Sequence, residues 1–297
     1  MAVYARRLSF FGPSKPISYL FSSRAFIEKF RALSLSRSSS CHLFSVYSCN
    51  EFENDAENGG HGFTKWRNGG GIFHNSACID PTVLIEIGAI VQSKAIVGAN
   101  VSVGSGAVIG PDVTIGQSTK IGYNVSLSNC TIGDSCVIHN GVCIGQDGFG
   151  FYVDEHGNMV KKPQMLNAKI GNHVEIGANS CVDRGSWRDT VIGDHSKIDN
   201  LVQIGHNVVI GSGCMLCGQV GIAGSATIGD YVTLGGRAAI RDHVFIASKV
   251  RLAANSCATK DIQEAGDYGG FPAVPINEWR RQVVAKFRTT KKELPQG

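Results

Sequence analysis

Aliphatic residues recur at every sixth position along most of this chain. They run without a miss from Ile192 to Leu252, and the same spacing runs upstream from Ile79 to Leu127. A helix repeats about every 3.6 residues and a strand about every 2, so neither element predicts a period of six. A six-residue period with Gly or another small residue often following the aliphatic one is typical of a hexapeptide parallel β-helix.

Each hexad predicts one short strand and one corner. The aliphatic side chain points into a triangular prism, and the small residue beside it allows a sharp bend. Three hexads make one coil, so the chain returns to the same edge, one layer higher, after about 18 residues. Between Ile79 and Leu252 there are 26 hexads, or roughly eight to nine coils. The fold class is therefore an all-β solenoid, a parallel β-helix over residues 72–262.

Two interruptions break the repeat. Residues 145–169 form a long excursion with the aromatic residues Phe149, Phe151 and Tyr152. A shorter excursion covers residues 183–191. A solenoid accepts insertions at its corners, and such insertions often build a binding face. We therefore expect the two loops to cover a ligand, with plain surface loops as the alternative.

The N-terminal part differs in composition from the repeat. Residues 1–48 hold seven basic residues, one acid and many serines, as an organelle transit peptide does, and the arginine spacing favours a mitochondrion over a plastid. Beyond this segment, the 28 basic and 24 acidic residues of the chain fall to 21 and 23, so the net charge of +4 does not indicate nucleic-acid binding. Residues 49–71 are polar and Gly-rich and predict a flexible leader. No stretch has the length and hydropathy of a transmembrane segment.

The C-terminal part, residues 263–297, predicts a turn followed by a short helix. This helix begins at about Ile276 and carries Trp279, Val283 and Phe287 on one stripe. Its other faces are basic. The helix is therefore either a solvated cap over the last coil or a docking site for an acidic partner.

The ten cysteines show no disulfide framework. Cys214 and Cys217 form a lone C-x-x-C pair without a second pair of ligands, so we predict no metal site. Packing among the coils, where a small and weakly polar side chain fits, is the interpretation for both residues.

The 18-residue coil also aligns polar residues along the prism. One coil above His206 lies Gly224, and one coil above Gly224 lies Asp242, next to His243. These residues are therefore expected to line one edge. An imidazole that accepts a proton beside a free backbone N–H can serve acyl transfer as general base and oxyanion donor. No G-x-S-x-G motif is present, which favours direct attack by the acceptor. The alternative is a histidine that is only a polar surface residue.

Several segments resemble the UDP-3-O-acylglucosamine N-acyltransferases of lipid A biosynthesis. They are Gln146-Asp147-Gly148-Phe149-Gly150-Phe151, Lys162-Pro163-Gln164, Val182-Asp183-Arg184-Gly185, the run from Ile198 to Asn207, Ala223-Gly224-Ser225 and Gly270-Phe271-Pro272-Ala273. The resemblance covers roughly residues 72–290. This ordered set is more specific than the hexads, which many acyltransferases share.

The resemblance implies a left-handed β-helix, whereas the general rule for parallel crossovers predicts a right-handed one. It also implies a homotrimer that moves an (R)-3-hydroxyacyl chain to the 2-amine of a UDP-3-O-acylglucosamine. The acyl donor is carried on the phosphopantetheine of acyl carrier protein, and no bound cofactor is expected.

The resemblance also assigns roles to single residues. His206 is the general base, and the Gly224 N–H is the oxyanion donor. The implied substrate-binding residues are Asp199, Asn200, Gln203, Asn207, Ser225, His243, Phe149 and Gly150. The implied carrier-protein contacts are Lys260, Arg280 and Arg281.

One departure from the family concerns uridine. Its bacterial members carry a folded N-terminal domain of roughly a hundred residues that holds uridine between aromatic rings. Here a short leader takes that place. Phe63 and Trp66 are the aromatic side chains that follow Gly59-Gly60 in this leader. The resemblance therefore leaves open how this chain binds uridine.

Three other functions compete with the N-acyltransferase. A related sugar-nucleotide O-acyltransferase, or an acetyltransferase that uses acetyl-CoA, shares the hexads. A γ-class carbonic anhydrase needs histidine ligands of which two are typically five residues apart, and no two histidines here have that spacing. A non-catalytic binding solenoid would bind no acyl donor.

Overall fold

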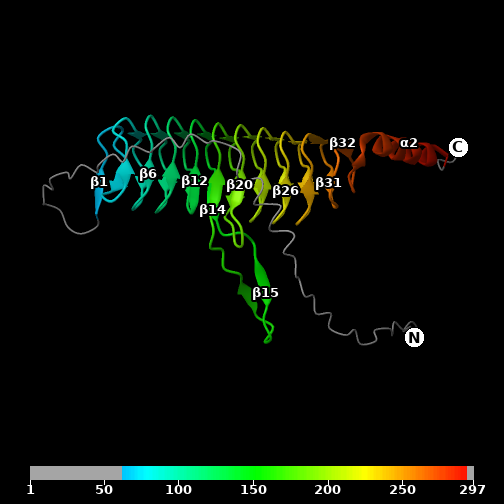
Figure 1. Cartoon of the computed structure of the whole chain (residues 1–297), viewed down its shortest axis with the longest axis horizontal. Helices are drawn as coiled ribbons and strands as arrows, with labels where there is room; N and C mark the ends of the chain where they lie inside the picture. The colour runs from blue at the N-terminus through cyan, green and yellow to red at the C-terminus, as the bar shows by residue number, and fades with distance from the viewer. Residues whose placement is uncertain (1–61, 293–297) are drawn as a thin grey trace, which may run out of the picture. The chain divides into compact units, whose positions relative to one another are not determined.

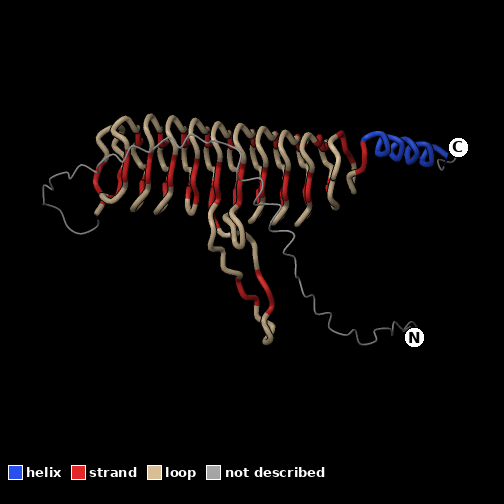
Figure 2. The backbone as a smooth tube through the Cα atoms, in the orientation of Figure 1, coloured by secondary structure: helices blue, strands red, loops and turns tan. Residues whose placement is uncertain are grey.

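The structure, a computed structural model, describes residues 62–292. Figure 1 shows these residues wound into stacked coils, with a hairpin that leaves the stack and a helix at its C-terminal end. The coils pass through three sheets of short strands joined by corners (Figure 2). The solenoid is a left-handed parallel β-helix, as the resemblance implies. The predicted transit peptide (1–48) and the leader as far as residue 61 lie outside the described residues.

Three sheets form the faces of the prism. Within the described residues, sheet A has 11 strands: β1 (Phe63–Lys65), β2 (Ile72–His74), β5 (Ile90–Val91), β8 (Val108–Ile109), β11 (Ser126–Leu127), β14 (Cys143–Gln146), β19 (Cys181–Asp183), β22 (Gln203–Ile204), β25 (Gly221–Ile222), β28 (Ala239–Ile240) and β31 (Cys257–Ala258). Sheet C has nine: β3 (Cys78–Ile79), β6 (Ile96–Val97), β9 (Thr114–Ile115), β12 (Cys130–Ile132), β17 (Ala168–Ile170), β20 (Thr190–Ile192), β23 (Val209–Ile210), β26 (Thr227–Ile228) and β29 (Phe245–Ile246).

Sheet D completes the prism. Among the described residues it has 11 strands: β4 (Leu84–Ile85), β7 (Ser102–Val103), β10 (Lys120–Ile121), β13 (Val137–Ile138), β18 (Glu175–Ile176), β21 (Lys197–Ile198), β24 (Met215–Leu216), β27 (Thr233–Leu234), β30 (Val250–Leu252), β32 (Gly266–Gly269) and β33 (Val274–Pro275). The chain visits sheets A, C and D in turn, so the prism has three edges. We name them the A–C, C–D and D–A edges after the sheets that they join.

The hexad residue of each strand fills the core. Ile204, Ile222 and Ile240 stack in register in sheet A, and each is almost completely buried. Because every strand adds one such side chain to the same column, the coils bury a continuous apolar core that no single coil could bury alone. At most corners, one residue of the turn adopts a left-handed conformation, as Asn207 does with a φ of 60°.

The solenoid is longer than the 26 predicted hexads. Three further strands belong to it within the described residues: β2 and β31, which lie inside the predicted range of 72–262 but outside the counted hexads, and β32, which lies beyond that range. Their inward residues are Phe73, Ala258 and Tyr268, which are not aliphatic residues of the hexad kind and so escaped the pattern.

The predicted flexible leader is wrong for residues 62–71. Its strand β1 pairs antiparallel with β2, and the Trp66 indole N–H donates to the Val83 carbonyl at 2.9 Å. The Gly-rich composition misled the prediction because these glycines serve a tight approach. A Cβ on Gly71 would lie 2.4 Å from the Ile85 side chain.

The C-terminal part contains more strand than predicted. Strand β32 continues sheet D beyond β30, and β33 pairs antiparallel with it, before helix α2 (Ile276–Lys292) begins at the predicted residue. Trp279 packs on Gly269 and Gly270, so this part of the stripe does cap the last coil. The side chain of Phe287 lies outside the described part. Among the described residues, no helix has the length and hydropathy to cross a membrane.

Candidate active site at the A–C edge

Both insertions leave the solenoid at the A–C edge. The longer one lies between β14 and β17 and contains the hairpin of β15 (Phe151–Val153) and β16 (Met159–Lys161), which points away from the coils in Figure 1. The shorter one lies between β19 and β20. His206 lies on the same edge in the next coil, between β22 and β23. The two interruptions of the repeat therefore flank the predicted base.

The His206 imidazole lies against two glycines. A Cβ on Gly224 would lie 2.7 Å from Cε1 and 2.8 Å from Nε2 of His206. A Cβ on Gly148, in the longer insertion, would lie 2.7 Å from the His206 Cβ. The expected placement of Gly224 directly above His206 is thus confirmed, and only Gly at both positions leaves room for the ring.

Asn207 orients the His206 ring. Its side chain is 1% exposed, and its Nδ2 lies 2.8 Å from His206 Nδ1. Its Oδ1 accepts the Ser186 N–H at 2.6 Å, which fixes the orientation of the carboxamide. The amide therefore donates to Nδ1, and a neutral His206 in this arrangement carries its proton on Nε2.

The Gly224 N–H is an unused donor. In several corresponding turns, this N–H donates to a side chain one coil above, as Ser212 does to Asp230 Oδ1 at 2.8 Å. One coil above Gly224 is Asp242, whose carboxylate pairs instead with Arg241 at 3.3 Å. No hydrogen bond within residues 62–292 uses the Gly224 N–H. The glycine that packs against the imidazole therefore has a free backbone donor.

A buried carboxylate lies below His206. Asp183 Oδ1 accepts from Gln146 Nε2 at 2.9 Å and from Gln203 Nε2 at 3.3 Å. Burial raises the pKa of the Asp183 carboxyl, and the two amide hydrogen bonds and the charge of a protonated His206 act in the opposite direction. Gln203, an expected substrate residue, thus binds this carboxylate. An ionised Asp183 stabilises an imidazolium at His206.

Two more expected residues belong to the A–C edge. Ser225 is buried, and its N–H donates to the His206 carbonyl at 2.8 Å. His243 is exposed, and its N–H donates to the Gly224 carbonyl at 3.1 Å. The edge therefore brings together His206, Gly224, Asn207, Ser225 and His243.

Phe149 and Gly150 lie at the base of the hairpin. Phe149 is 86% exposed, and its ring packs against Phe151 with 5.0 Å between centroids. A Cβ on Gly150 would lie 3.1 Å from Gln164 Nε2. In this insertion, Gly148 is the residue that touches His206. The contacts of Phe149 and Gly150 are with other residues of the same insertion.

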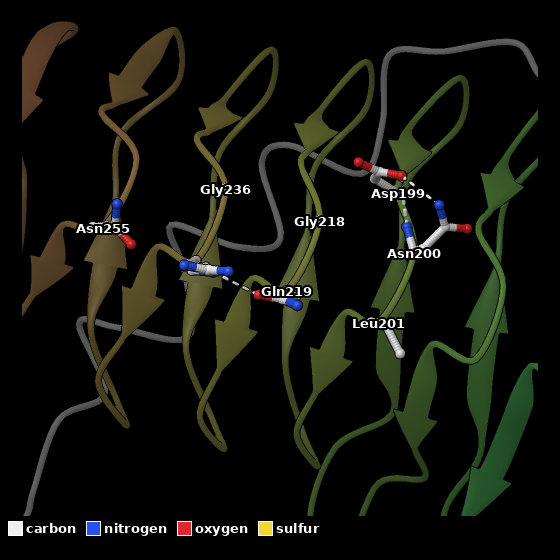
Figure 3. A pocket seen from close by; sticks show the side chains of 8 residues that line it. Asp199, Asn200, Leu201, Gly218, Gln219, Gly236 and Asn255 are labelled. Atoms are coloured by element: carbon white, nitrogen blue, oxygen red, sulfur yellow. Dashed lines mark hydrogen bonds between the residues drawn. The ribbon is translucent and has the colours of Figure 1, made fainter.

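Asp199 and Asn200 lie on another edge. They line a shallow surface pocket of about 410 Å³ on the D–A edge, at the opposite end of β22 from His206 (Figure 3). Gly218 and Gly236 leave this hollow because they carry no side chain, and Arg237 donates to Gln219 Oε1 at 2.7 Å across it. One chain alone therefore does not bring Asp199 and Asn200 to His206.

The three expected carrier-protein contacts are surface residues. Lys260 lies near the last coil, and Arg280 and Arg281 lie on α2; all three side chains are exposed. The Arg281 Nε donates to the Asn277 carbonyl one turn earlier, at 3.3 Å. The positive charge is therefore at the C-terminal end of the solenoid.

The cysteine pair is split between core and surface. Cys214 is completely buried, and its Sγ lies 3.1 Å from the Gly229 carbonyl, so the packing interpretation is confirmed for it. The packing interpretation is wrong for Cys217, which is exposed because its position faces outward at a corner. In the part of the chain that the structure describes, no group of three or more His, Cys, Asp or Glu side chains is placed to hold a metal ion.

Four residues of this site were absent from the predicted set, namely Gly148, Asp183, Ser186 and Trp187. All four lie in or beside the two insertions, where the 18-residue spacing does not apply. Gly148 and Asp183 had an indirect signal, because both stand in the motifs quoted above, and the parallel register of β14 and β19 pairs Asp183 with Gln146 of the same motifs.

Known proteins resemble the chain across this site. Residues 189–224 match the family of bacterial transferase hexapeptides (six repeats). A protein of Arabidopsis thaliana named probable UDP-3-O-acylglucosamine N-acyltransferase 2, mitochondrial, is 72% identical over 233 residues, which are 78% of this chain and 77% of that protein.

More distant relatives match a smaller share of this chain. The UDP-3-O-acylglucosamine N-acyltransferase of Methylobacterium sp. (strain 4-46) is 45% identical over 57% of this chain, and the match spans 47% of the bacterial protein, about half of its length. The structure of LpxA from Acinetobacter baumannii has a TM-score of 0.54 at 28% identity and covers 71% of this chain and 77% of that one. A UDP-N-acetylglucosamine acyltransferase from Campylobacter jejuni has a TM-score of 0.53 at 22% identity, covers 66% of this chain and 72% of its own, and shows the shared fold.

Proposed function

This chain belongs to the family of UDP-3-O-acylglucosamine N-acyltransferases, and we propose that it moves an (R)-3-hydroxyacyl chain from acyl carrier protein to the 2-amine of a UDP-3-O-acylglucosamine. The observation that carries the proposal is the contact of the His206 imidazole with Gly224, whose N–H is free. No bound cofactor takes part, since the acyl group arrives on the phosphopantetheine arm of its carrier.

The reaction needs a base and an oxyanion donor. The amine nitrogen attacks the thioester carbonyl carbon, and the new C–N bond forms as charge develops on the carbonyl oxygen. The Gly224 N–H stabilises that oxyanion, and His206 takes the proton that the nitrogen loses. The C–S bond then breaks, and the His206 imidazolium gives its proton to the leaving sulfur, which leaves the amide product, the thiol of the carrier and a neutral His206.

Proton transfer to His206 Nε2 requires a change at Asn207. In the arrangement described above, Nδ1 accepts from Asn207 and Nε2 bears the proton. The base needs the opposite tautomer, in which Nδ1–H donates and Nε2 holds the lone pair. Rotation of the Asn207 carboxamide would present Oδ1 to Nδ1 and produce that tautomer, at the cost of the hydrogen bond from Ser186. Asp183 then stabilises the imidazolium that forms.

A homotrimer would complete the site. Asp199 and Asn200 lie on the D–A edge, whereas His206 lies on the A–C edge. Side-by-side prisms related by a threefold axis would set the D–A edge of one chain against the A–C edge of the next. The sugar-binding residues and the base would then come from two chains, and each of the three grooves would hold one substrate.

The carrier protein would dock at the C-terminal end. Lys260, Arg280 and Arg281 are exposed there, and acyl carrier protein is acidic. Charge attraction of this kind mainly raises the rate of encounter and falls with salt. His243, exposed on the A–C edge towards that end, would contact the incoming phosphopantetheine arm or the acceptor.

The site of action would be the mitochondrion. Residues 1–48 have the composition of a transit peptide, and the Arabidopsis relative is named mitochondrial. A plastid is the alternative. Expression of the full chain fused to a fluorescent protein distinguishes the two organelles.

The test is an assay of two acceptors with the purified protein. Offered (R)-3-hydroxyacyl carrier protein, the enzyme should acylate UDP-3-O-acylglucosamine and form an amide, which mass spectrometry detects. UDP-N-acetylglucosamine, which offers only hydroxyls, should remain unmodified. Transfer to the hydroxyl acceptor, or from acetyl-CoA alone, would establish the O-acyltransferase or acetyltransferase alternative instead.

A further inference from the structure

Trp187 is an exposed aromatic residue beside the candidate base. It lies in the shorter insertion, and 62% of its surface is open to solvent. Its indole N–H nevertheless reaches Ser225 Oγ, at 3.4 Å, two coils further along the A–C edge. The ring is thus both open to solvent and tied to the edge that carries His206, so it is accessible to a ligand bound there.

Arg188 holds this ring in place. The guanidinium carbon lies 4.8 Å from the centroid of the Trp187 ring and covers one face of it. The guanidinium is itself anchored, because Nε donates to the Asn207 carbonyl at 2.7 Å and Nη2 donates to the Ser225 carbonyl at 3.0 Å. Trp187 is thus a flat surface with a fixed orientation and one covered face.

A short chain of contacts joins Trp187 to the base. Ser225 Oγ lies 3.4 Å from both the Trp187 Nε1 and the Asn207 Nδ2. Asn207 Nδ2 lies 2.8 Å from His206 Nδ1. Two side chains, Ser225 and Asn207, therefore connect the aromatic ring to the imidazole on the same edge of the prism.

We propose that Trp187 binds the pyranose ring of the sugar-nucleotide acceptor, with the C–H face of the sugar packed on the open surface of the indole. This inference rests on the proposed function. The amine that reacts at His206 is bonded directly to the pyranose ring. The uracil is separated from that amine by the sugar and the diphosphate, so the pyranose is the ring of the acceptor that lies closest to the reacting amine.

Fluorescence titration tests the contact directly. The chain has three tryptophans, Trp66, Trp187 and Trp279, so the difference between the wild type and Trp187→Phe isolates the signal of Trp187. Glucosamine 1-phosphate and UDP-glucosamine should both quench the wild type, with saturation, and should not quench the variant. Quenching by UMP but not by glucosamine 1-phosphate would assign the ring to uracil and overturn the proposal. Quenching that requires an acylated ligand would assign it to the acyl chain and overturn it equally.

Kinetics provide a second readout. Trp187→Ala should raise the KM for the acceptor about tenfold while kcat stays within about twofold, and Trp187→Phe should restore most of the affinity. Tyr231→Ala is the matched control, since Tyr231 is equally exposed but lies on the C–D edge. An unchanged KM in Trp187→Ala overturns the inference and leaves the proposed function standing. If the wild type acylates no amine, the proposed function fails, and the fluorescence titration still decides what Trp187 binds.

Discussion

The histidines of the C–D edge and of the A–C edge differ in their surroundings, and of these two edges only the A–C edge is built like a reaction site. On the C–D edge, His173 and His195 are exposed and stack on each other, with 4.8 Å between centroids and 5° between planes. On the A–C edge, His206 lies between two glycines, and the buried Asn207 holds its ring. A position in the repeat therefore does not by itself make a histidine a catalytic residue. The side chains and glycines around the imidazole decide its role.

The backbone donors of the two edges differ in the same way. Along the C–D edge, the turn N–H groups of Asp134, Asn172 and Asp230 each donate to a side chain one coil above. These hydrogen bonds join successive coils and so stabilise the stack. On the A–C edge, Gly224 replaces a polar side chain, and its own N–H has no such acceptor above it. The A–C edge keeps a base and a donor available for substrate.

The largest expected difference between the two edges is the change in kcat when one histidine is removed from each. His206→Ala should lower kcat about 10²- to 10⁴-fold, because the general base is lost. His195→Ala should leave kcat close to that of the wild type, since its imidazole touches only the C–D edge. Steady-state assays with the amine acceptor measure both. Similar losses in the two variants would contradict the comparison.

A methyl group at Gly224 tests the contact with the base. Gly224→Ala would place its Cβ 2.7 Å from His206 Cε1, so the ring must move away from the oxyanion donor. We expect kcat to fall about 10²- to 10³-fold, the loss typical of a missing oxyanion donor. Gly221→Ala in the same coil is the control, because a Cβ there meets nothing within 4 Å. Full activity of Gly224→Ala would exclude the proposed oxyanion role.

Two substitutions of Asn207 should act in opposite directions. Asn207→Ala removes the group that orients the imidazole and leaves the Ser186 N–H without its acceptor, so kcat should fall about tenfold or more and stability by about 1–3 kcal/mol. Asn207→Asp can accept from both Ser186 and His206 Nδ1–H, which puts the lone pair on Nε2. Its kcat should equal or exceed that of the wild type. Equal losses in the two variants would show that the tautomer of His206 does not limit the reaction.

The regular coils could be predicted from the sequence because one rule governs them. Every six residues an aliphatic side chain enters the core, and this rule alone placed Gly224 above His206. The same rule failed where a coil is closed by a different side chain. Phe73 and Tyr268 fill the inward positions of β2 and β32, and neither fits an aliphatic repeat.

The parts of the site that escaped prediction lie in the insertions. The position of Trp187 depends on the anchoring of Arg188 by backbone carbonyls of two later coils, and no local spacing encodes such contacts. The D–A placement of Asp199 follows from the hexads, since it precedes β22 whereas His206 follows it. Its part in the site could not follow from one chain, because the proposed site needs two chains.

Asp183 gives the smallest expected effect and separates stability from function. Burial raises the pKa of its carboxyl above the ordinary value of 3.8, so the folded state holds this proton more tightly than the unfolded state does. Stability must then fall as the pH rises from about 3.8 through the raised pKa, and the penalty is complete above that raised pKa. Asp183→Asn keeps an oxygen that accepts from Gln146 and Gln203 and removes the penalty.

The Asp183→Asn protein should therefore be no less stable than the wild type at neutral pH, and the two should converge in acid. Its kcat should nevertheless fall about tenfold, because an uncharged residue stabilises the His206 imidazolium less, and tenfold corresponds to about 1.4 kcal/mol of the barrier. Thermal unfolding at several pH values and kcat for the amine acceptor measure the two effects. A variant that loses stability at neutral pH would show that the charge serves the fold. One that keeps full kcat would show that the charge does not serve the base.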